Sequence, residues 1–136
     1  MSSASNETTI RRFFEVVWNK GDVAQIDAFL APDFRSHNGL QVAITDSAGY
    51  AHGVLMMRTA LPDLSTMLEL VFSDGDYVCV RGRDRGTHVG ELFGRPGGGR
   101  TVTMTWIEIF RMQDGRAAEG WVEMDTADFF RQLEGS

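Results

Sequence analysis

Residues 101–124 read TVTMTWIEIFRMQDGRAAEGWVEM, and this stretch decides the fold. Residues 101–112 and residues 116–124 are both strand-like. Their side chains alternate between two faces, with the two-residue period of an extended chain. Asp114-Gly115 separates the two runs and is a dipeptide typical of tight hairpin turns. The stretch therefore predicts two antiparallel strands joined by a hairpin.

The same pattern extends upstream of this hairpin. Residues 64–73 and 77–88 are strand-like, and Asp74-Gly75 between them is another turn dipeptide. Residues 94–100, GRPGGGR, resemble a phosphate-binding loop only in their glycine content. The segment lacks the Lys-Ser/Thr ending and lies between strands instead of opening a helix, so we interpret it as a flexible hairpin loop. The second half of the chain thus predicts an antiparallel meander.

The first half of the chain has the period of helices. Apolar residues recur three and four positions apart over residues 6–19, which predicts a helix that Ser5 or Asn6 caps and Gly21 ends. The remaining predicted elements are a short helix over residues 23–30 capped by Asp22, an extended piece over 34–38, a helix over about 46–60 and a final helix over 126–133.

Helices followed by a meander predict an α+β fold. We expect residues 1–136 to form one domain, because this length falls within the usual domain size. A strongly curved, mainly antiparallel sheet with helices packed on its concave face leaves a cavity inside. Such a cavity is the default ligand site, and here we expect it to take a small, largely apolar molecule.

Composition narrows the classes of partner and cofactor. The formal net charge of −6 disfavours nucleic acid and anionic membrane surfaces, since phosphate binding requires clustered positive charge. Cys79 is the one cysteine, so we expect no disulfide framework and no cysteine-based metal site. The first residues show no secretory signal and no stretch is long enough to span a bilayer, which favours a cytoplasmic location.

Glu108 is the carboxylate that the strand pattern singles out. Alternation places it on one face of the third strand with Met104, Trp106 and Phe110. If this face is concave, desolvation raises the pKa of Glu108 above its unperturbed value and suits it to proton transfer near neutrality. Two alternatives remain open from the residues alone: the threonine-bearing face points inward, or Glu108 pairs with an arginine.

The three histidines and the opposite sheet face suggest further roles. His37, His52 and His88 match no metal-ligand spacing, and no dinucleotide fingerprint is present, so we expect no metal, flavin or nicotinamide. His37 and His88 fall at the ends of elements, where pocket mouths form. Opposite Glu108, the apolar set of Ile107, Ile109 and Trp121 predicts a homodimer formed through the outer sheet face.

Several segments match a known family in their order and spacing. They are RFFEVVWNKGD at 12–22, LAPDF at 30–34, LPDL at 61–64, GTHVGE at 86–91, IFRMQDGR at 109–116, and DT at 125–126 leading to QL at 132–133. Through these segments nearly the whole chain resembles the SnoaL-like polyketide cyclases and ester cyclases of the NTF2-like superfamily. The resemblance implies an NTF2-like cone, usually dimeric, that encloses a cofactor-free pocket.

The segment that carries the catalytic residue in this family has changed here. In the cyclases, a pocket aspartate in a His-Trp-Asp-like or His-Arg-Asp segment is the general acid/base of an intramolecular aldol closure. The corresponding residues 119–125 read EGWVEMD, with Gly120 at the histidine position and Val122 at the aspartate position. Asp125 matches a second acidic position that looks structural. We therefore expect a larger, more apolar pocket and do not expect the aldol mechanism unchanged.

Glu108 is the acidic residue that remains for this role. The resemblance aligns it with a position where many ester-cyclase-like members carry an acidic residue, and it aligns His37 with a histidine common in the broader family. We therefore expect Glu108 to be the general acid/base, with His37 and His88 as further catalytic candidates. The expected substrate contacts are Trp18, Met56, Trp106, Gly120, Val122 and Met124.

The predicted function is a cofactor-independent cyclase or isomerase that acts on a polyketide-like apolar intermediate in natural-product biosynthesis. Two alternatives stay open. The first keeps the fold but changes the reaction to hydroxylation or epoxide opening, as in a SnoaL-like hydroxylase. The second is a small-molecule-binding protein without turnover, because one fold can host many unrelated functions.

Overall fold

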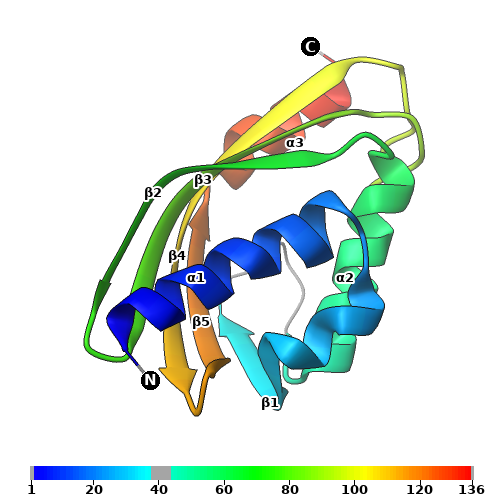
Figure 1. The fold of residues 1–136 in the computed structure, drawn as a ribbon. Helices are drawn as coiled ribbons and strands as arrows, with labels where there is room; N and C mark the ends of the chain where they lie inside the picture. The colour runs from blue at the N-terminus through cyan, green and yellow to red at the C-terminus, as the bar shows by residue number, and fades with distance from the viewer. Residues whose placement is uncertain (1, 38–43, 136) are drawn as a thin grey trace.

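A computed structural model describes residues 2–37 and 44–135, with helices in the first half of the chain and most strands in the second. Figure 1 shows α1 and α2 on the concave side of a strongly bent sheet. The elements in chain order are α1 (Ser3–Phe13), η1 (Phe14–Asn19), η2 (Val23–Ala28), β1 (Leu30–His37), α2 (Ser47–Ala60), β2 (Ser65–Asp74), β3 (Tyr77–Thr87), β4 (Thr101–Gln113), β5 (Arg116–Met124) and α3 (Thr126–Glu134).

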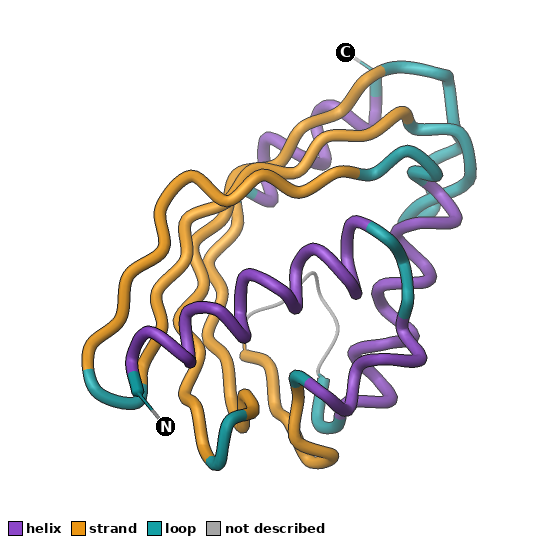
Figure 2. The backbone as a smooth tube through the Cα atoms, viewed as in Figure 1, coloured by secondary structure: helices purple, strands orange, loops and turns teal. Residues whose placement is uncertain are grey.

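The sheet has five strands in the order β1-β5-β4-β3-β2. Strand β1 runs parallel to β5, and the other neighbouring pairs are antiparallel, as expected for a mainly antiparallel sheet. Along its length the sheet bends strongly without closing into a barrel (Figure 2). The predicted α+β fold and the predicted hairpins at Asp74-Gly75 and Asp114-Gly115 are therefore confirmed.

The short elements before α2 differ most from the prediction. The helix predicted over residues 23–30 is a 3-10 helix that stops at Ala28, and Leu30 already belongs to β1. The extended piece predicted to begin at Phe34 therefore begins earlier, because pairing of Leu30 with Ala117 on β5 draws this residue into the sheet. Asn38, at the end of the predicted piece, lies outside the described residues.

The first helix begins earlier and is less regular than predicted. Ser2 caps it by accepting a hydrogen bond from the Ser5 amide, so neither Ser5 nor Asn6 is the cap. From Phe14 the chain continues as the π-helical segment η1, in which the Lys20 amide donates to the Glu15 carbonyl five residues earlier. Gly21 then ends the helix with a positive φ of 70°, as its sequence position predicted.

Two apolar clusters fill the two ends of the concave side. At one end Phe13 has no exposed surface, and its ring contacts those of Phe14, Phe29, Tyr50 and Phe110. Burial of each such ring stabilises the fold by roughly 1.5–3 kcal/mol. At the other end α3 and the end of α2 pack on β4 through a second cluster that includes Met57, Leu61, Leu92, Val102, Met104, Phe129 and Leu133.

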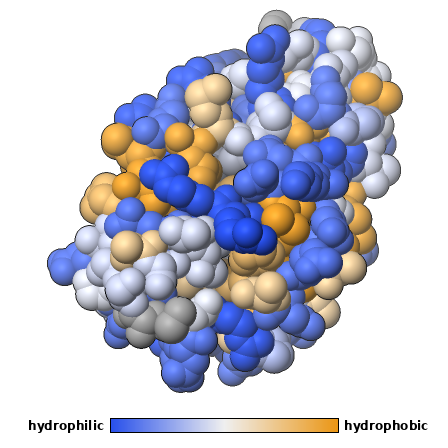
Figure 3. Space-filling model, viewed as in Figure 1, coloured by the Kyte–Doolittle hydropathy of each residue, from blue (hydrophilic) through white to orange (hydrophobic). Residues whose placement is uncertain are grey.

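The outer face of the sheet carries large apolar side chains in contact with solvent. Ile107 and Ile109 on β4 are 48% and 40% exposed, and Trp121 on β5 is partly exposed beside them. The edge strand β2, separated from β4 by β3, adds Leu70 and Phe72, which pair in register with Arg81 and Cys79 of β3 on the same face. Apolar atoms gather on the surface over β2 in Figure 3. We call Leu70, Phe72, Ile107, Ile109 and Trp121 the outer apolar patch.

Within the described residues, no helix is both long enough and apolar enough to cross a membrane.

Candidate active site

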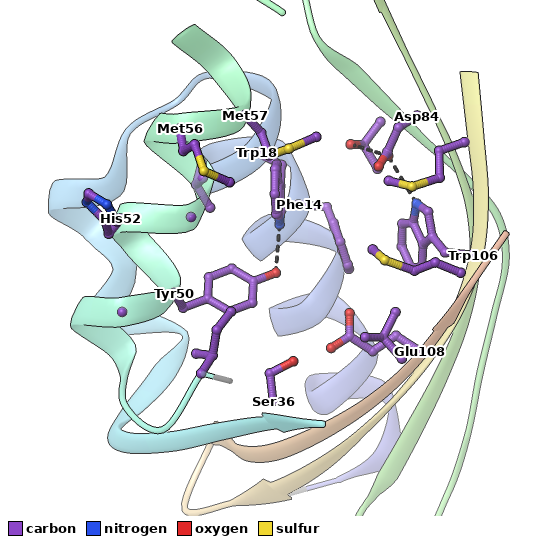
Figure 4. A pocket seen from close by; sticks show the side chains of 18 residues that line it. Phe14, Trp18, Ser36, Tyr50, His52, Met56, Met57, Asp84, Trp106 and Glu108 are labelled. Atoms are coloured by element: carbon purple, nitrogen blue, oxygen red, sulfur yellow. Dashed lines mark hydrogen bonds between the residues drawn. The ribbon is translucent and has the colours of Figure 1, made fainter. Parts of the chain in front are cut away.

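A cavity of about 320 Å³ lies between the concave sheet face and the helices. Its walls come from η1 and α2 on one side and from β3, β4 and β5 on the other (Figure 4). The lining includes six residues expected from sequence to face the pocket: Trp18, Met56, Trp106, Glu108, Val122 and Met124. Most of the remaining lining is apolar or aromatic, which suits an apolar ligand.

Glu108 points from the middle of β4 into this cavity, as Figure 4 shows. The residue is 5% exposed, and its Oε2 has no hydrogen-bond partner among the described residues. Burial in apolar surroundings raises the pKa of Glu108 to about 8, with a further contribution from the charge of Asp84. Glu108 is therefore protonated at neutral pH and can donate a hydrogen bond or a proton to a ligand.

Gly120 borders the site without lining the cavity. It pairs with Phe110 across β4 and β5, and a Cβ added to it would lie 2.7 Å from Glu108 Oε2 and 3.1 Å from Phe34 Cζ. The Glu108 carboxyl therefore occupies space that a side chain at position 120 would need. This packing gives a physical reason why a glycine accompanies Glu108. We expected Gly120 to contact substrate, but it does not line the cavity.

Asp84 on β3 is a second carboxyl in the cavity, and the sequence analysis did not identify it. Its Oδ1 accepts hydrogen bonds from Trp106 Nε1 at 3.0 Å and from Thr66 Oγ1 at 2.8 Å. Burial raises the pKa of Asp84 to about 6, against the opposing effect of these two donors. At neutral pH Asp84 is therefore mostly ionised, whereas Glu108 is mostly neutral.

Gly82 allows Trp106 to reach Asp84. Gly82 and Trp106 are cross-strand partners, and a Cβ on Gly82 would lie 2.2 Å from the Trp106 ring. The indole therefore lies directly against the β3 backbone, with Phe14 stacked on it at a centroid distance of 5.1 Å. This arrangement holds the indole N–H, and through it the Asp84 carboxylate, in one position.

The helix wall carries two polar groups opposite the carboxyls. Tyr50 on α2 accepts a hydrogen bond from Trp18 Nε1 at 2.8 Å through its hydroxyl oxygen. Burial and the charge of Glu108 raise the pKa of Tyr50 well above its ordinary value, so the phenol stays neutral. His52, also on α2, lines the cavity, although its lone position in the sequence gave no reason to select it.

The structure does not bring His37 or His88 to the cavity. His37 lies on the outer sheet face, because Ser36, its neighbour along β1, points inward. Its Nε2 is 2.7 Å from Glu119 Oε2, and its ring stacks on Trp121. This contact holds the pKa of Glu119 below its usual range. His88 is buried outside the cavity lining, where Nε2 finds no partner among the described residues.

No group of three or more His, Cys, Asp or Glu side chains in residues 2–37 and 44–135 could hold a metal ion. The absence of a metal, a flavin or a nicotinamide from the working protein stays a prediction of the sequence.

A bent five-stranded sheet with helices over its concave face and an apolar cavity between them defines the NTF2-like class of α+β proteins. Within that class, the family model described as SnoaL-like polyketide cyclase matches residues 8–133. The chain therefore belongs to the SnoaL-like polyketide cyclase family, as the resemblance in its sequence led us to expect. Comparison with curated proteins gives no match.

Solved structures of similar chains cover nearly the whole fold. TsrD from Streptomyces laurentii is 29% identical with a TM-score of 0.88, covering 100% of this chain and 99% of that one. IdmH from Streptomyces antibioticus, a candidate polyketide cyclase, is 29% identical with a TM-score of 0.80 and coverages of 94% and 97%. AclR from Streptomyces galilaeus, a candidate hydroxylase, is 23% identical with a TM-score of 0.85 and coverages of 97% and 97%, a likeness of fold alone.

Proposed function

We propose that this chain is a cofactor-independent enzyme that cyclises or isomerises a polyketide-like apolar intermediate in natural-product biosynthesis. The observation that carries the proposal is the Glu108 carboxyl, buried in an apolar cavity with Oε2 unpartnered among the described residues. A buried polar group without a partner is costly to the fold, so its presence favours a role toward a ligand. Membership of the SnoaL-like polyketide cyclase family supports the substrate class.

The cavity can contribute to cyclisation in two ways. Its apolar walls hold a flexible chain with its reacting ends together, and such positioning can lower the barrier by about 7–11 kcal/mol. Glu108 then donates its proton to a ligand carbonyl oxygen on which negative charge develops during the reaction. In an isomerisation the same proton stabilises the enol.

Turnover by the purified protein tests this proposal. The probe is an apolar aryl β-diketone ester that can close a ring by aldol condensation, and the product is followed by liquid chromatography and mass spectrometry. We expect ring-closed or double-bond-shifted product at a rate that exhaustive dialysis against EDTA does not change. Binding of the probe with no product above the buffer rate would contradict the enzyme proposal and favour a binding protein.

The outer apolar patch is expected to form a homodimer interface, because an exposed apolar surface of this kind usually meets a partner. Light scattering should give twice the 15.1 kDa chain mass. Ile109→Glu places a charge in the patch and should shift the protein to the monomer. Leu55→Glu on α2, at a side chain exposed to 47%, is the matched control and should leave the dimer intact. A monomeric unmodified protein would contradict the prediction.

A further inference from the structure

The cavity contains two carboxyls in different states, and the proposed function uses only one of them. Asp84 and Glu108 lie on neighbouring strands of the same wall, with Trp106 between them (Figure 4). In the sheet register Asp84 pairs with Met104, and Glu108 pairs with Val80. The two positions are thus four residues apart along the strands, about 13 Å in the strand direction, and both side chains line the cavity. A ligand carbonyl beside Trp106 can therefore lie between the two carboxyls.

The hydrogen bonds of Asp84 fix its carboxylate and leave one oxygen available. Trp106 Nε1 and Thr66 Oγ1 both donate to Oδ1, and no described residue donates to Oδ2. The residue is partly accessible and lines the cavity. If the fold required only an acceptor for Trp106 and Thr66, an asparagine would serve without burying a charge beside another carboxyl. The presence of a carboxylate at this position therefore indicates a use for the charge.

We propose, on the basis of the proposed function, that Asp84 is the base of this site. Asp84 removes a proton from the carbon next to a ligand carbonyl, while Glu108 protonates the oxygen of that carbonyl. The ligand class is accordingly an apolar ketone or polyketone with an acidic C–H bond. A carboxylate fixed by two donors and a carboxylic acid in an apolar setting form the unequal pair that acid/base catalysis requires.

The step balances without a co-reactant. The C–H bond breaks and its proton goes to Asp84 Oδ2, while its electron pair becomes the carbon–carbon double bond of the enol. The carbonyl π electrons form the new O–H bond with the proton that Glu108 gives up. Return of a proton from Asp84 to the same carbon restores the ketone, and return to a conjugated carbon gives the isomer; in both cases the enol O–H proton goes back to Glu108. In ring closure the enol carbon attacks a second carbonyl carbon, the π electrons of that carbonyl form an O–H bond with the proton held by Asp84, and the enol O–H proton returns to Glu108.

Hydrogen–deuterium exchange of 2-tetralone tests the assignment, because exchange requires only proton removal and return. The protein is incubated with 2-tetralone in D₂O, and loss of the C1 hydrogen signal is followed by proton NMR. Asp84→Asn keeps an acceptor for Trp106 and Thr66 and removes the basic oxygen, so exchange should slow by about 10²–10⁴-fold. Asp63→Asn is the matched control: Asp63 also accepts two hydrogen bonds, from Thr87, but lies outside the cavity lining, so exchange should not change.

A pH profile of the unmodified protein provides a second readout that does not depend on folding of the variant. The titratable groups that line the cavity are Asp84 from β3, Glu108 from β4, and Tyr50 and His52 from α2. Exchange should rise with pH as Asp84 ionises near pH 6 and fall as Glu108 loses its proton near pH 8.

The outcomes separate this inference from the proposed function. Exchange at the unmodified rate in Asp84→Asn, together with its loss in Glu108→Gln, would overturn the role of Asp84 and leave the proposed function standing. A protein that neither exchanges 2-tetralone nor turns over the β-diketone ester would overturn both. An acid limb that persists in folded Asp84→Asn would assign the base to another group.

Discussion

Glu108→Gln is expected to lower kcat for the cyclisation or isomerisation by about 10²–10⁴-fold. The substitution keeps the size and shape of the side chain but leaves an amide that cannot give up a proton to the carbonyl oxygen. Burial keeps the Glu108 carboxyl protonated at neutral pH, with a pKa of about 8, so the variant loses this proton donor in the cavity. Steady-state kinetics on the β-diketone ester measures kcat and KM separately.

Val122→Ala is the matched control for this measurement. Val122 is the cross-strand partner of Glu108 and lines the same cavity, but it has no proton to transfer. Truncation removes packing against the substrate, so KM should rise while kcat changes little. Full activity in Glu108→Gln would contradict the acid/base role and would leave conformational steering by the cavity as the source of catalysis.

The free energy of unfolding is expected to fall as pH rises from 5 to 8, and the fall should be smaller in Glu108→Gln. The pKa of Glu108 is about 8 in the folded chain, against 4.5 for an unperturbed glutamate, so between these values the folded state holds a proton that the unfolded state has released. Stability from this group is therefore complete below the unfolded pKa and is lost as pH rises through the folded pKa, at up to about 1.4 kcal/mol per pH unit.

Urea unfolding at several pH values measures this slope. Asp84, with its pKa raised to about 6, contributes in the same direction below that pH, so the difference between the two proteins should be clearest from pH 6 to 8. Glu15→Gln, at a carboxyl whose side chain is 64% exposed, is the control and should keep the slope of the unmodified protein. Equal slopes for Glu108→Gln and the unmodified protein would mean that the Glu108 carboxyl is not held neutral by burial.

Period-two alternation predicted that Glu108 shares a strand face with Met104, Trp106 and Phe110, but it left open which face points inward; in the structure this face is the concave one. The same alternation along β3 places Asp84 in line with Val78 and Val80, which are fully buried, so the signal for the second carboxyl was also present. Its contacts were not predictable. They depend on the register of β3 against β4 and on the absence of a side chain at Gly82, neither of which a single strand reveals.

The position of His37 could not be predicted from the sequence. A short extended segment in the first half of the chain does not reveal which distant strand it will join. Parallel pairing with β5 sets His37 opposite Trp121 on the outer face, while Ser36 faces the cavity. Matching His37 to a histidine common in the family therefore identified the type of residue but not the side of the sheet on which it lies.

The π-helical segment Phe14–Asn19 has a consequence for how this chain is compared and re-engineered. A π turn accommodates one residue more than an α turn, so it is equivalent to a single-residue insertion in an otherwise regular helix. An alignment with a relative whose first helix is regular will need a one-residue gap here, and without it every later helix position is matched to the wrong partner. Deleting one residue would straighten the helix and rotate Trp18 by about 100° away from Tyr50.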